Sequence, residues 1–335
     1  KVKSMRAIVF SKKNTPVLIE KPTKKPQSGQ VLIEIHASGI CHTDLEVMRG
    51  NYGSSAFPLV PGHEYAGLVC EIGPDVTNLR VGDRVVVDPN LECGSCRACK
   101  KGWAHLCETL GAYGVTCDGG FAEYSLVQAS QVHSIGDMPY DIAALAEPLG
   151  CVLNGLQAAH ADRAGSALIF GAGPIGLLMA IGLQVSGVND ISLVDLNRTR
   201  LSLAESFGFK AIEAHSEALN SLRQNVDLVA DATGVPAVAT KLIDYIANGG
   251  VGLFFGVCPS EARIEVSPFE LFRRQITLAG SHSLNHNIPQ AIDGLKAYGP
   301  DIGRLVSHRL SLAGINQVFE GYGPKDSLKI QFCRQ

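Results

Sequence analysis

The hydrophobic residues in the first part of the chain form short runs between polar turns. Three of these runs have the composition of strands and are separated by turns that contain Gly and Pro: Val31–Ile35, Gly67–Ile72 and Arg84–Val87. Short runs of this composition with turn residues between them predict strands. We therefore expect residues 31 to 132 to form a compact, mostly β domain.

From about Gly165 the pattern changes to apolar strands that alternate with helical stretches. Such alternation indicates βαβ units and a parallel sheet. A helical stretch at 155–164 is expected to link the two regions, and 307–310 is expected to be a final strand that returns to the first domain. The predicted strands of the second region are 167–170, 191–194, 226–230 and 251–255. The expected fold class is α/β, with domains at 1–153 and 154–286 and a return segment at 287–335.

Length, charge and cysteine content narrow the range of protein classes to which this chain can belong. The chain has 335 residues, which is too long for one typical domain, and 46% of them are hydrophobic. The formal net charge is −3, and no basic stripe is present that could bind nucleic acid. No apolar run reaches the roughly 18 residues of a membrane span, so a cytoplasmic location without a membrane partner is expected. The ten cysteines form one cluster plus scattered singles, which favours metal binding over a disulfide framework.

The cysteine cluster follows the spacing C-x2-C-x2-C-x7-C. Two-residue gaps let successive thiolates converge on one tetrahedral Zn²⁺, and four thiolates leave no open coordination position. We therefore expect a structural zinc site, with an iron–sulfur cluster and buried free thiols as the competing interpretations. The four predicted ligands are Cys93, Cys96, Cys99 and Cys107.

A glycine-rich loop follows the first predicted strand of the second region. In a G-x-G-x-x-G loop between strand and helix, the glycines make the turn, admit a pyrophosphate and let helix pack on strand. Asp195 stands 19 residues after the loop, where a carboxylate can accept from ribose hydroxyls and repel a 2′-phosphate. NAD is therefore favoured over NADP, although Arg198 and Arg200 leave room for the phosphorylated form. The loop residues expected to bind the coenzyme are Gly171, Gly173, Pro174, Ile175 and Gly176.

Three further segments offer ligands for a second metal. A catalytic zinc needs about three protein ligands and one open position for water or substrate. The segments supply Cys, His and carboxylate groups before and after the cysteine cluster, and their co-occurrence with the other two motifs points to such a centre. The candidates are Cys41, His63, Glu64, Glu147 and Cys151.

Together these motifs resemble those of the zinc-dependent medium-chain alcohol dehydrogenases, over nearly the whole chain. The resemblance implies a GroES-like, mostly β catalytic domain joined to a Rossmann coenzyme domain, with zinc held by Cys41 and His63. It leaves the third ligand open, because simple alcohol dehydrogenases place a cysteine at Cys151 and the polyol branch a glutamate matching Glu147 or Glu64. We favour Glu147, since Glu-Pro is typical of the polyol branch, with Glu64 as a ligand or a group near the metal.

The resemblance also implies roles for the residues after Cys41. The Thr43 hydroxyl is expected to pass the released proton onward, and His42 to contact the coenzyme pyrophosphate. Glu46 stands where yeast-type relatives carry the histidine that ends the relay, so Glu46 is a candidate proton acceptor. Asp44 is a candidate acceptor that orients His63.

The expected reaction is the oxidation of a secondary hydroxyl of a polyol to a ketose, with hydride transfer to NAD. The polar stretch 281–287 lacks the arginine of sorbitol dehydrogenases, which favours another or a broader sugar alcohol. The alternatives are a simple alcohol dehydrogenase with Cys41, His63 and Cys151 as ligands, and a non-catalytic nucleotide-binding relative. The resemblance further implies a homodimer or homotetramer, built through an edge strand near Gly250 to Val257.

Overall fold

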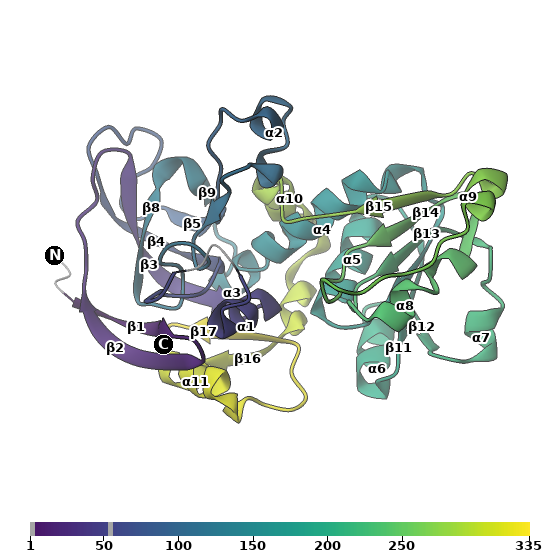
Figure 1. The fold of residues 1–335 in the computed structure, drawn as a ribbon. Coiled ribbons are helices and arrows are strands. Elements are labelled where there is room, and N and C mark those ends of the chain that lie inside the picture. The colour runs from purple at the N-terminus through teal and green to yellow at the C-terminus, as the bar shows by residue number, and fades with distance from the viewer. Residues whose placement is uncertain (1–3, 53–55) are drawn as a thin grey trace. The chain divides into compact units, whose positions relative to one another are not determined.

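The computed structural model describes residues 4–52 and 56–335. The chain divides into two compact units: Lys1–Glu147 with Ile288–Gln335, and Pro148–Asn287 (Figure 1). Helix α4 (Ala146–Ala158) begins at the end of the first stretch and continues into the second unit. The last 48 residues therefore belong to the same unit as the first 147.

The first unit is built on a seven-stranded sheet. Its order is β16-β17-β3-β4-β5-β9, and β8 pairs with β3. The predicted strands at 31–35, 67–72 and 84–87 are confirmed, the first two as parts of longer strands. The strand predicted at 307–310 is confirmed as β16, but it is not the last, because β17 follows it and lies between β16 and β3. The bounds are β3 (Gln30–Gly39), β4 (Glu64–Ile72), β5 (Arg84–Val87), β8 (Tyr124–Gln128), β9 (Val132–Ser134), β16 (Val306–Leu310) and β17 (Lys329–Cys333).

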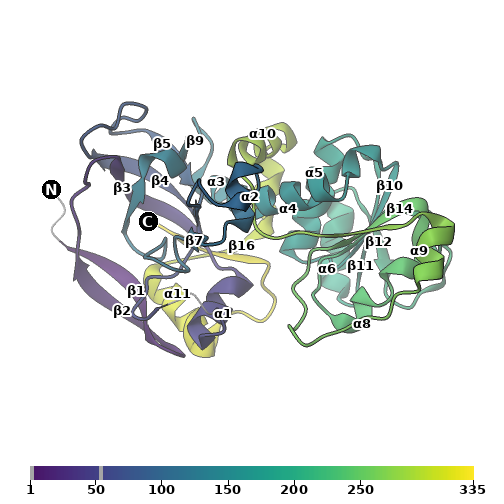
Figure 2. The same cartoon turned by 45° about the horizontal axis from the view of Figure 1, so that its top comes forward.

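The alternation of side chains along β3 explains how this sheet buries one face. Val31, Ile33 and Ile35 are fully buried in a core of aliphatic and aromatic residues, whereas Glu34 and His36 on the other face are half-buried. A separate hairpin, β1 (Ser4–Lys12) with β2 (Thr15–Pro22), packs beside helix α11 (Leu312–Gln317) (Figures 1 and 2). The other elements of this unit include α1 (His42–Arg49), β6 (Asn90–Leu91), α2 (Arg97–Lys100), β7 (Gly111–Ala112), α3 (Tyr140–Ala143) and α10 (Ile288–Tyr298).

The second unit is a six-stranded, all-parallel sheet of order β12-β11-β10-β13-β14-β15. This is the order of the doubly wound dinucleotide-binding fold, so the predicted Rossmann architecture is confirmed. The helix that follows its first strand, α5, buries Leu177 to Ile181 completely. The bounds are β10 (Ser166–Phe170), α5 (Pro174–Val185), β11 (Asp190–Asp195), α6 (Arg198–Ser206), β12 (Lys210–Glu213), α7 (Glu217–Asn220), β13 (Val226–Asp231), α8 (Pro236–Ala239), β14 (Ile246–Phe254), α9 (Pro268–Arg274) and β15 (Thr277–Gly280).

Two expectations about elements are wrong. The strand near Gly250 to Val257 is not an edge, because β14 pairs with β13 on one side and β15 on the other. The linking helix begins at Ala146 rather than at 155, so Glu147 and Cys151 lie in its first two turns. Among the described residues no helix combines the length and the apolar character needed to cross a membrane.

Candidate functional site

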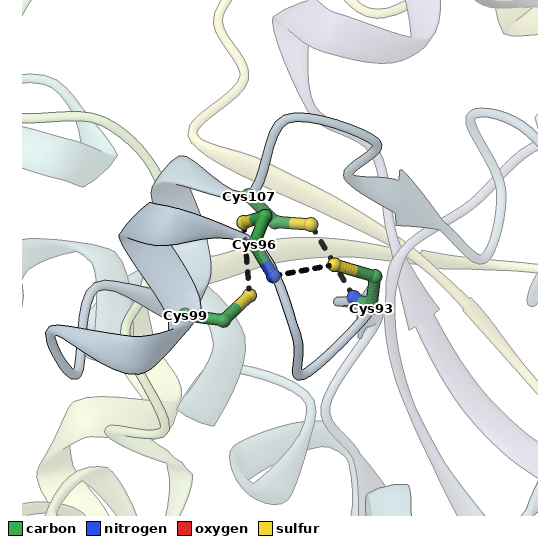
Figure 3. A group of neighbouring side chains, drawn as sticks. All are labelled: Cys93, Cys96, Cys99 and Cys107. Atoms are coloured by element: carbon green, nitrogen blue, oxygen red, sulfur yellow. Dashed lines mark hydrogen bonds between the residues drawn. The ribbon is translucent and has the colours of Figure 1, made fainter.

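The four predicted cysteine ligands converge on one point (Figure 3). Their sulfur atoms all lie within 4.8 Å of one another, and Sγ of Cys96 lies 3.5 Å from Sγ of Cys99. Zinc with Zn–S bonds of about 2.3 Å in a tetrahedron separates its sulfurs by about 3.8 Å. Cys96 is the N-cap of the short helix α2 and Cys99 lies within it, whereas Cys93 and Cys107 come from the segments before and after this helix. The geometry fits a closed structural zinc site.

The protonation of these thiols also favours a bound cation. The hydroxyl and the backbone N–H of Ser95 donate to Sγ of Cys93 and lower the pKa of that thiol to about 5. Desolvation and the neighbouring thiols of Cys96 and Cys107 raise the pKa of Cys99 to about 12. Four thiols this close together cannot all lose their protons unless a cation offsets the negative charge, and a metal ion would do so.

A second group of ligand atoms comes from Cys41, His63 and Glu64. A thiol sulfur, an imidazole nitrogen and a carboxylate oxygen lie within 4.8 Å of one another in the first unit. Cys41 directly precedes α1, and Glu64 is the first residue of β4, so the group forms where a helix begins beside a strand. This donor set of one sulfur, one nitrogen and one oxygen suits a zinc centre that keeps a position open.

Asp44 joins the segments that carry these ligands. Its buried carboxylate accepts from the backbone N–H of Cys41 at 2.8 Å and from that of Gly62 at 3.1 Å. Oδ1 of Asp44 also lies 3.4 Å from Nδ1 of His63. The predicted position of Asp44 beside His63 is thus confirmed, as a charge contact rather than a hydrogen bond.

The charges around His63 explain its protonation. Burial disfavours the protonated ring, but the carboxylate of Asp44 and the thiol of Cys41 outweigh burial and raise the pKa of His63 well above its ordinary value. A divalent metal would displace this proton, because only neutral imidazole coordinates. The anions that attract the proton would also attract the metal.

Lys329 is a residue of this site that the sequence analysis did not find. Its Nζ donates to both carboxylate oxygens of Glu64 at 2.5 Å and to the carbonyl oxygen of Ile40 at 3.1 Å. Burial opposes the ammonium form, but the charges of Glu64, Cys41 and Glu147 raise the pKa of Lys329 above its ordinary value. In the sequence Lys329 alternates with apolar residues, a pattern typical of a lysine on the solvent face of a strand.

The other candidates for catalysis and metal binding have different surroundings. Glu147 is buried, and Cys151 is half-buried one turn further along α4. Thr43 is half-buried in the first turn of α1, whereas the side chain of His42 is 73% exposed. The roles assigned to these four residues stay predictions.

Glu46 takes part in a small surface network. Its carboxylate accepts from Asn51 at 2.7 Å and from Arg49 at 2.6 Å, and these two hydrogen bonds lower its pKa. Nε2 of His42 lies 3.5 Å from the same carboxylate. Glu46 is therefore an ionised but weakly basic group.

The glycine loop of the second unit has the geometry of a phosphate-binding turn. Gly171 has φ of 103°, and a Cβ on Gly176 would overlap the carbonyl oxygen of Gly171. A Cβ on Gly173 would lie no closer than 3.8 Å to another side chain, Nη1 of Arg200, so the backbone there is open to a ligand. Pro174 occupies the first turn of α5, whose N-terminus favours an anion.

Asp195 closes the next strand and holds the loop in place. Its carboxylate accepts from the backbone N–H of Ala172 at 2.8 Å and from that of Asn197 at 2.9 Å. Nη1 of Arg200 lies 3.9 Å from it. A carboxylate and a guanidinium thus stand together beside the loop, and they have opposite preferences for a 2′-phosphate.

Comparisons with known proteins agree with this architecture. Residues 27–137 match the alcohol dehydrogenase GroES-like domain, and residues 140–327 match the glucose dehydrogenase C-terminus. The chain is 50% identical to D-altritol 5-dehydrogenase of Agrobacterium fabrum, over 99% of this chain and 100% of the relative. It is 30% identical to D-arabinitol dehydrogenase 1 of Uromyces fabae, over 97% of this chain and 96% of the relative. A solved zinc-binding dehydrogenase of Sinorhizobium meliloti, bound to NADP, superposes with a TM-score of 0.93 at 28% identity, over 99% of both chains.

The predicted family resemblance, including the likeness to the polyol branch, is confirmed by these relatives. The two metal-ligand groups and the Rossmann sheet are the features that this family combines for NAD(P)-dependent oxidation of CH–OH groups. The chain belongs to the zinc-dependent medium-chain alcohol dehydrogenase family.

Proposed function

We propose that this protein oxidises a secondary hydroxyl of a five- or six-carbon sugar alcohol to a ketose. The carbon loses a hydride to NAD⁺ and the hydroxyl loses a proton to solvent, which gives the ketose, NADH and H⁺. The observation that carries the proposal is the 50% identity, over 99% of the chain, to a D-altritol 5-dehydrogenase. The identity to a D-arabinitol dehydrogenase supports the same substrate class.

The metal group gives this reaction a chemical basis. A zinc ion at Cys41, His63 and Glu64 would supply Lewis acidity that favours loss of the hydroxyl proton. Glu147 and Cys151 are the other candidates for the third ligand. The sequence favoured Glu147, but the carboxylate of Glu64 lies among the gathered ligand atoms, and we therefore propose Glu64 as the third ligand.

Three residues around α1 would serve the proton and the coenzyme. The half-buried Thr43 hydroxyl would accept the proton first and Glu46 would pass it to water. The exposed His42 would contact the coenzyme pyrophosphate. Thr43 and Glu46 both lie on α1, the helix that follows the ligand Cys41 directly.

We propose NAD as the preferred coenzyme. The carboxylate of Asp195 would accept from the ribose hydroxyls, and its charge would oppose a 2′-phosphate. Its side chain is only 11% exposed and two backbone N–H groups fix it, whereas the side chain of Arg200 is 43% exposed. The buried, hydrogen-bonded carboxylate should outweigh the more exposed guanidinium.

One assay panel tests substrate and coenzyme together. We expect kcat/KM with D-altritol or D-arabinitol to exceed that with ethanol by about 100-fold or more, and NAD to be preferred over NADP. Equal activity on ethanol would instead favour the simple-alcohol alternative with Cys151 as ligand. Cys41→Ser should abolish oxidation, and Cys70→Ser should not, because Cys70 belongs to neither metal group.

We further propose that the chain forms a homo-oligomer, a dimer or a tetramer. The edge strand β15 and the exposed aromatic pair on α9 support this, since Phe269 and Phe272 are 62% and 81% exposed with ring centroids 6.5 Å apart. Sedimentation of the wild type and of Phe272→Ser tests it. A wild-type monomer at assay concentration would contradict the proposal.

A further inference from the structure

The ion pair between Lys329 and Glu64 lies inside the ligand group rather than on the surface. The two side chains are 5% and 1% exposed, and both carboxylate oxygens accept from the same ammonium. The carbonyl oxygen of Ile40, next to the ligand Cys41, accepts a further hydrogen bond. The lysine is therefore held by the same segments that carry the metal ligands.

The strand order brings these two residues together. β3 lies between β17 and β4, and its last residue, Gly39, pairs with Gln331 on one side and Glu64 on the other. Lys329 and Gln331 are two residues apart on β17 and so share a face of the sheet. The Glu64 carboxylate crosses Gly39 to reach the lysine, and a Cβ on Gly39 would overlap that carboxylate.

Two cations, the ammonium of Lys329 and a bound zinc ion, could each neutralise Glu64, and they would have to share its two carboxylate oxygens. A carboxylate oxygen has lone pairs for an ammonium and a metal together. The ammonium, however, weakens the attraction of the carboxylate for a second cation and repels that cation directly. The lysine therefore has opposite effects on the protein with metal and without it.

We propose that Lys329 is a positioning residue that acts as an internal counter-cation for Glu64 and thereby lowers the affinity of the centre for zinc. Without metal the lysine keeps a buried carboxylate paired, and the fold stays intact. With metal it competes for the same oxygens. The proposal rests on the zinc site of the proposed function and is independent of the substrate.

The sign of the effect follows from linkage. Removal of one partner of a buried ion pair leaves an uncompensated charge, which strongly destabilises a protein. In Lys329→Met this penalty falls on the metal-free protein, whereas in the zinc-loaded protein the metal neutralises Glu64. Zinc binding therefore becomes more favourable, and stability depends more on zinc.

The test compares metal release and unfolding in wild type and Lys329→Met. We expect the catalytic zinc to leave to a chelator about ten-fold more slowly or slower still in Lys329→Met, with the four-cysteine zinc as internal reference. We also expect the rise in melting temperature on adding zinc to be larger in the variant. Lys325→Met, an exposed lysine on the preceding loop, should match the wild type in both measurements.

Faster or unchanged zinc release, with an equal loss of stability in both forms, would overturn the proposal and leave Lys329 a purely structural residue. If Lys329→Met does not fold without zinc, the double variant Glu64→Gln with Lys329→Met decides. Because it buries neither charge, its metal-free form should regain most of the wild-type stability. A double variant as unstable as the single one would also refute the role.

Discussion

At the scale of single residues, the site depends on residues that are not metal ligands themselves. Gly39 leaves room for the Glu64 carboxylate, and Asp44 ties the backbone of Cys41 and Gly62 to His63. The resemblance to the family implied Cys41 and His63 as zinc ligands, and Asp44 was a candidate acceptor beside His63. Lys329 was beyond such reasoning, because it lies 265 residues from Glu64 and only the folded sheet brings the two together.

Gly39→Ala should disturb the metal centre while the fold survives. The added methyl would overlap the Glu64 carboxylate, which is buried and cannot swing into solvent. We expect zinc affinity at this centre to fall by at least about 10-fold, because loss of a group that only orients a ligand already costs about 10- to 100-fold and Glu64 is a proposed ligand itself. Zinc analysis after dialysis against a weak chelator measures this. Full retention of two zinc ions per chain would show that Glu64 can move aside without loss.

Glu46→Gln tests the proton route. Arg49 and Asn51 lower the pKa of Glu46, so it is a weak base and its removal should cost less than the 10²–10⁴-fold typical of a general base. We expect kcat to fall by about two- to ten-fold, with an altered pH–rate profile. An unchanged profile would remove Glu46 from the relay.

At the scale of elements, hydrophobic periodicity predicted the four inner strands of the parallel sheet but missed its two edge strands. β12 and β15 have four residues each and no buried position, so they lack the apolar run that marks the equally short β5. The start of α4 was also missed, because Glu147 and Pro148 interrupt its apolar pattern although Pro is well tolerated in the first turn of a helix. Short elements take their structure from tertiary contacts, which local sequence does not encode.

Strand β3 carries a titratable cluster on the face opposite its core. His36 stacks on Tyr140 with ring centroids 4.3 Å apart, and Arg84 lies 4.0 Å over the same tyrosine ring. Burial lowers the pKa of His36, and the charges of Arg334 and Arg84 add to this, although Glu34 opposes them. His36 is therefore neutral in the fold at a pH where the unfolded chain begins to bind a proton.

The free energy of unfolding should consequently depend on pH through His36. The pKa of His36 in the folded protein lies below the unfolded value of about 6.5. The stabilisation that comes from neutral His36 is therefore complete above pH 6.5 and is lost as the pH falls toward the folded pKa. Denaturant unfolding of His36→Gln at pH values on both sides should show a smaller loss on acidification than the wild type. His215→Asn, at an exposed histidine, is the control and should behave as wild type. Equal losses in all three proteins would contradict the assignment.

At the scale of the whole molecule, the two functions of binding metal and binding coenzyme belong to different compact units. Both ligand groups lie in the first unit, and the glycine loop with Asp195 lies in the second. Each unit has a hydrophobic core of its own. Loss of metal should therefore leave the nucleotide fold intact.

A reciprocal pair of variants tests this separation. Cys41→Ser should lose about one zinc per chain and still bind NADH within about three-fold of the wild type, as measured by nucleotide fluorescence. Gly176→Ala should keep both zinc ions and lose coenzyme binding by ten-fold or more, because its Cβ would overlap the Gly171 carbonyl oxygen. Loss of NADH binding in Cys41→Ser would show that the units are not independent.

The position of Lys329 on β17 also predicts the order in which the two metal sites form during synthesis. The four cysteines lie within one loop, from Cys93 to Cys107, and so can capture zinc as soon as that loop has left the ribosome. Glu64 emerges earlier, but its partner lysine follows only after the entire second unit has been translated. Non-local contacts of this kind close late in folding. A nascent chain should thus hold its structural zinc first, while its catalytic centre takes final form only when β17 pairs with β3.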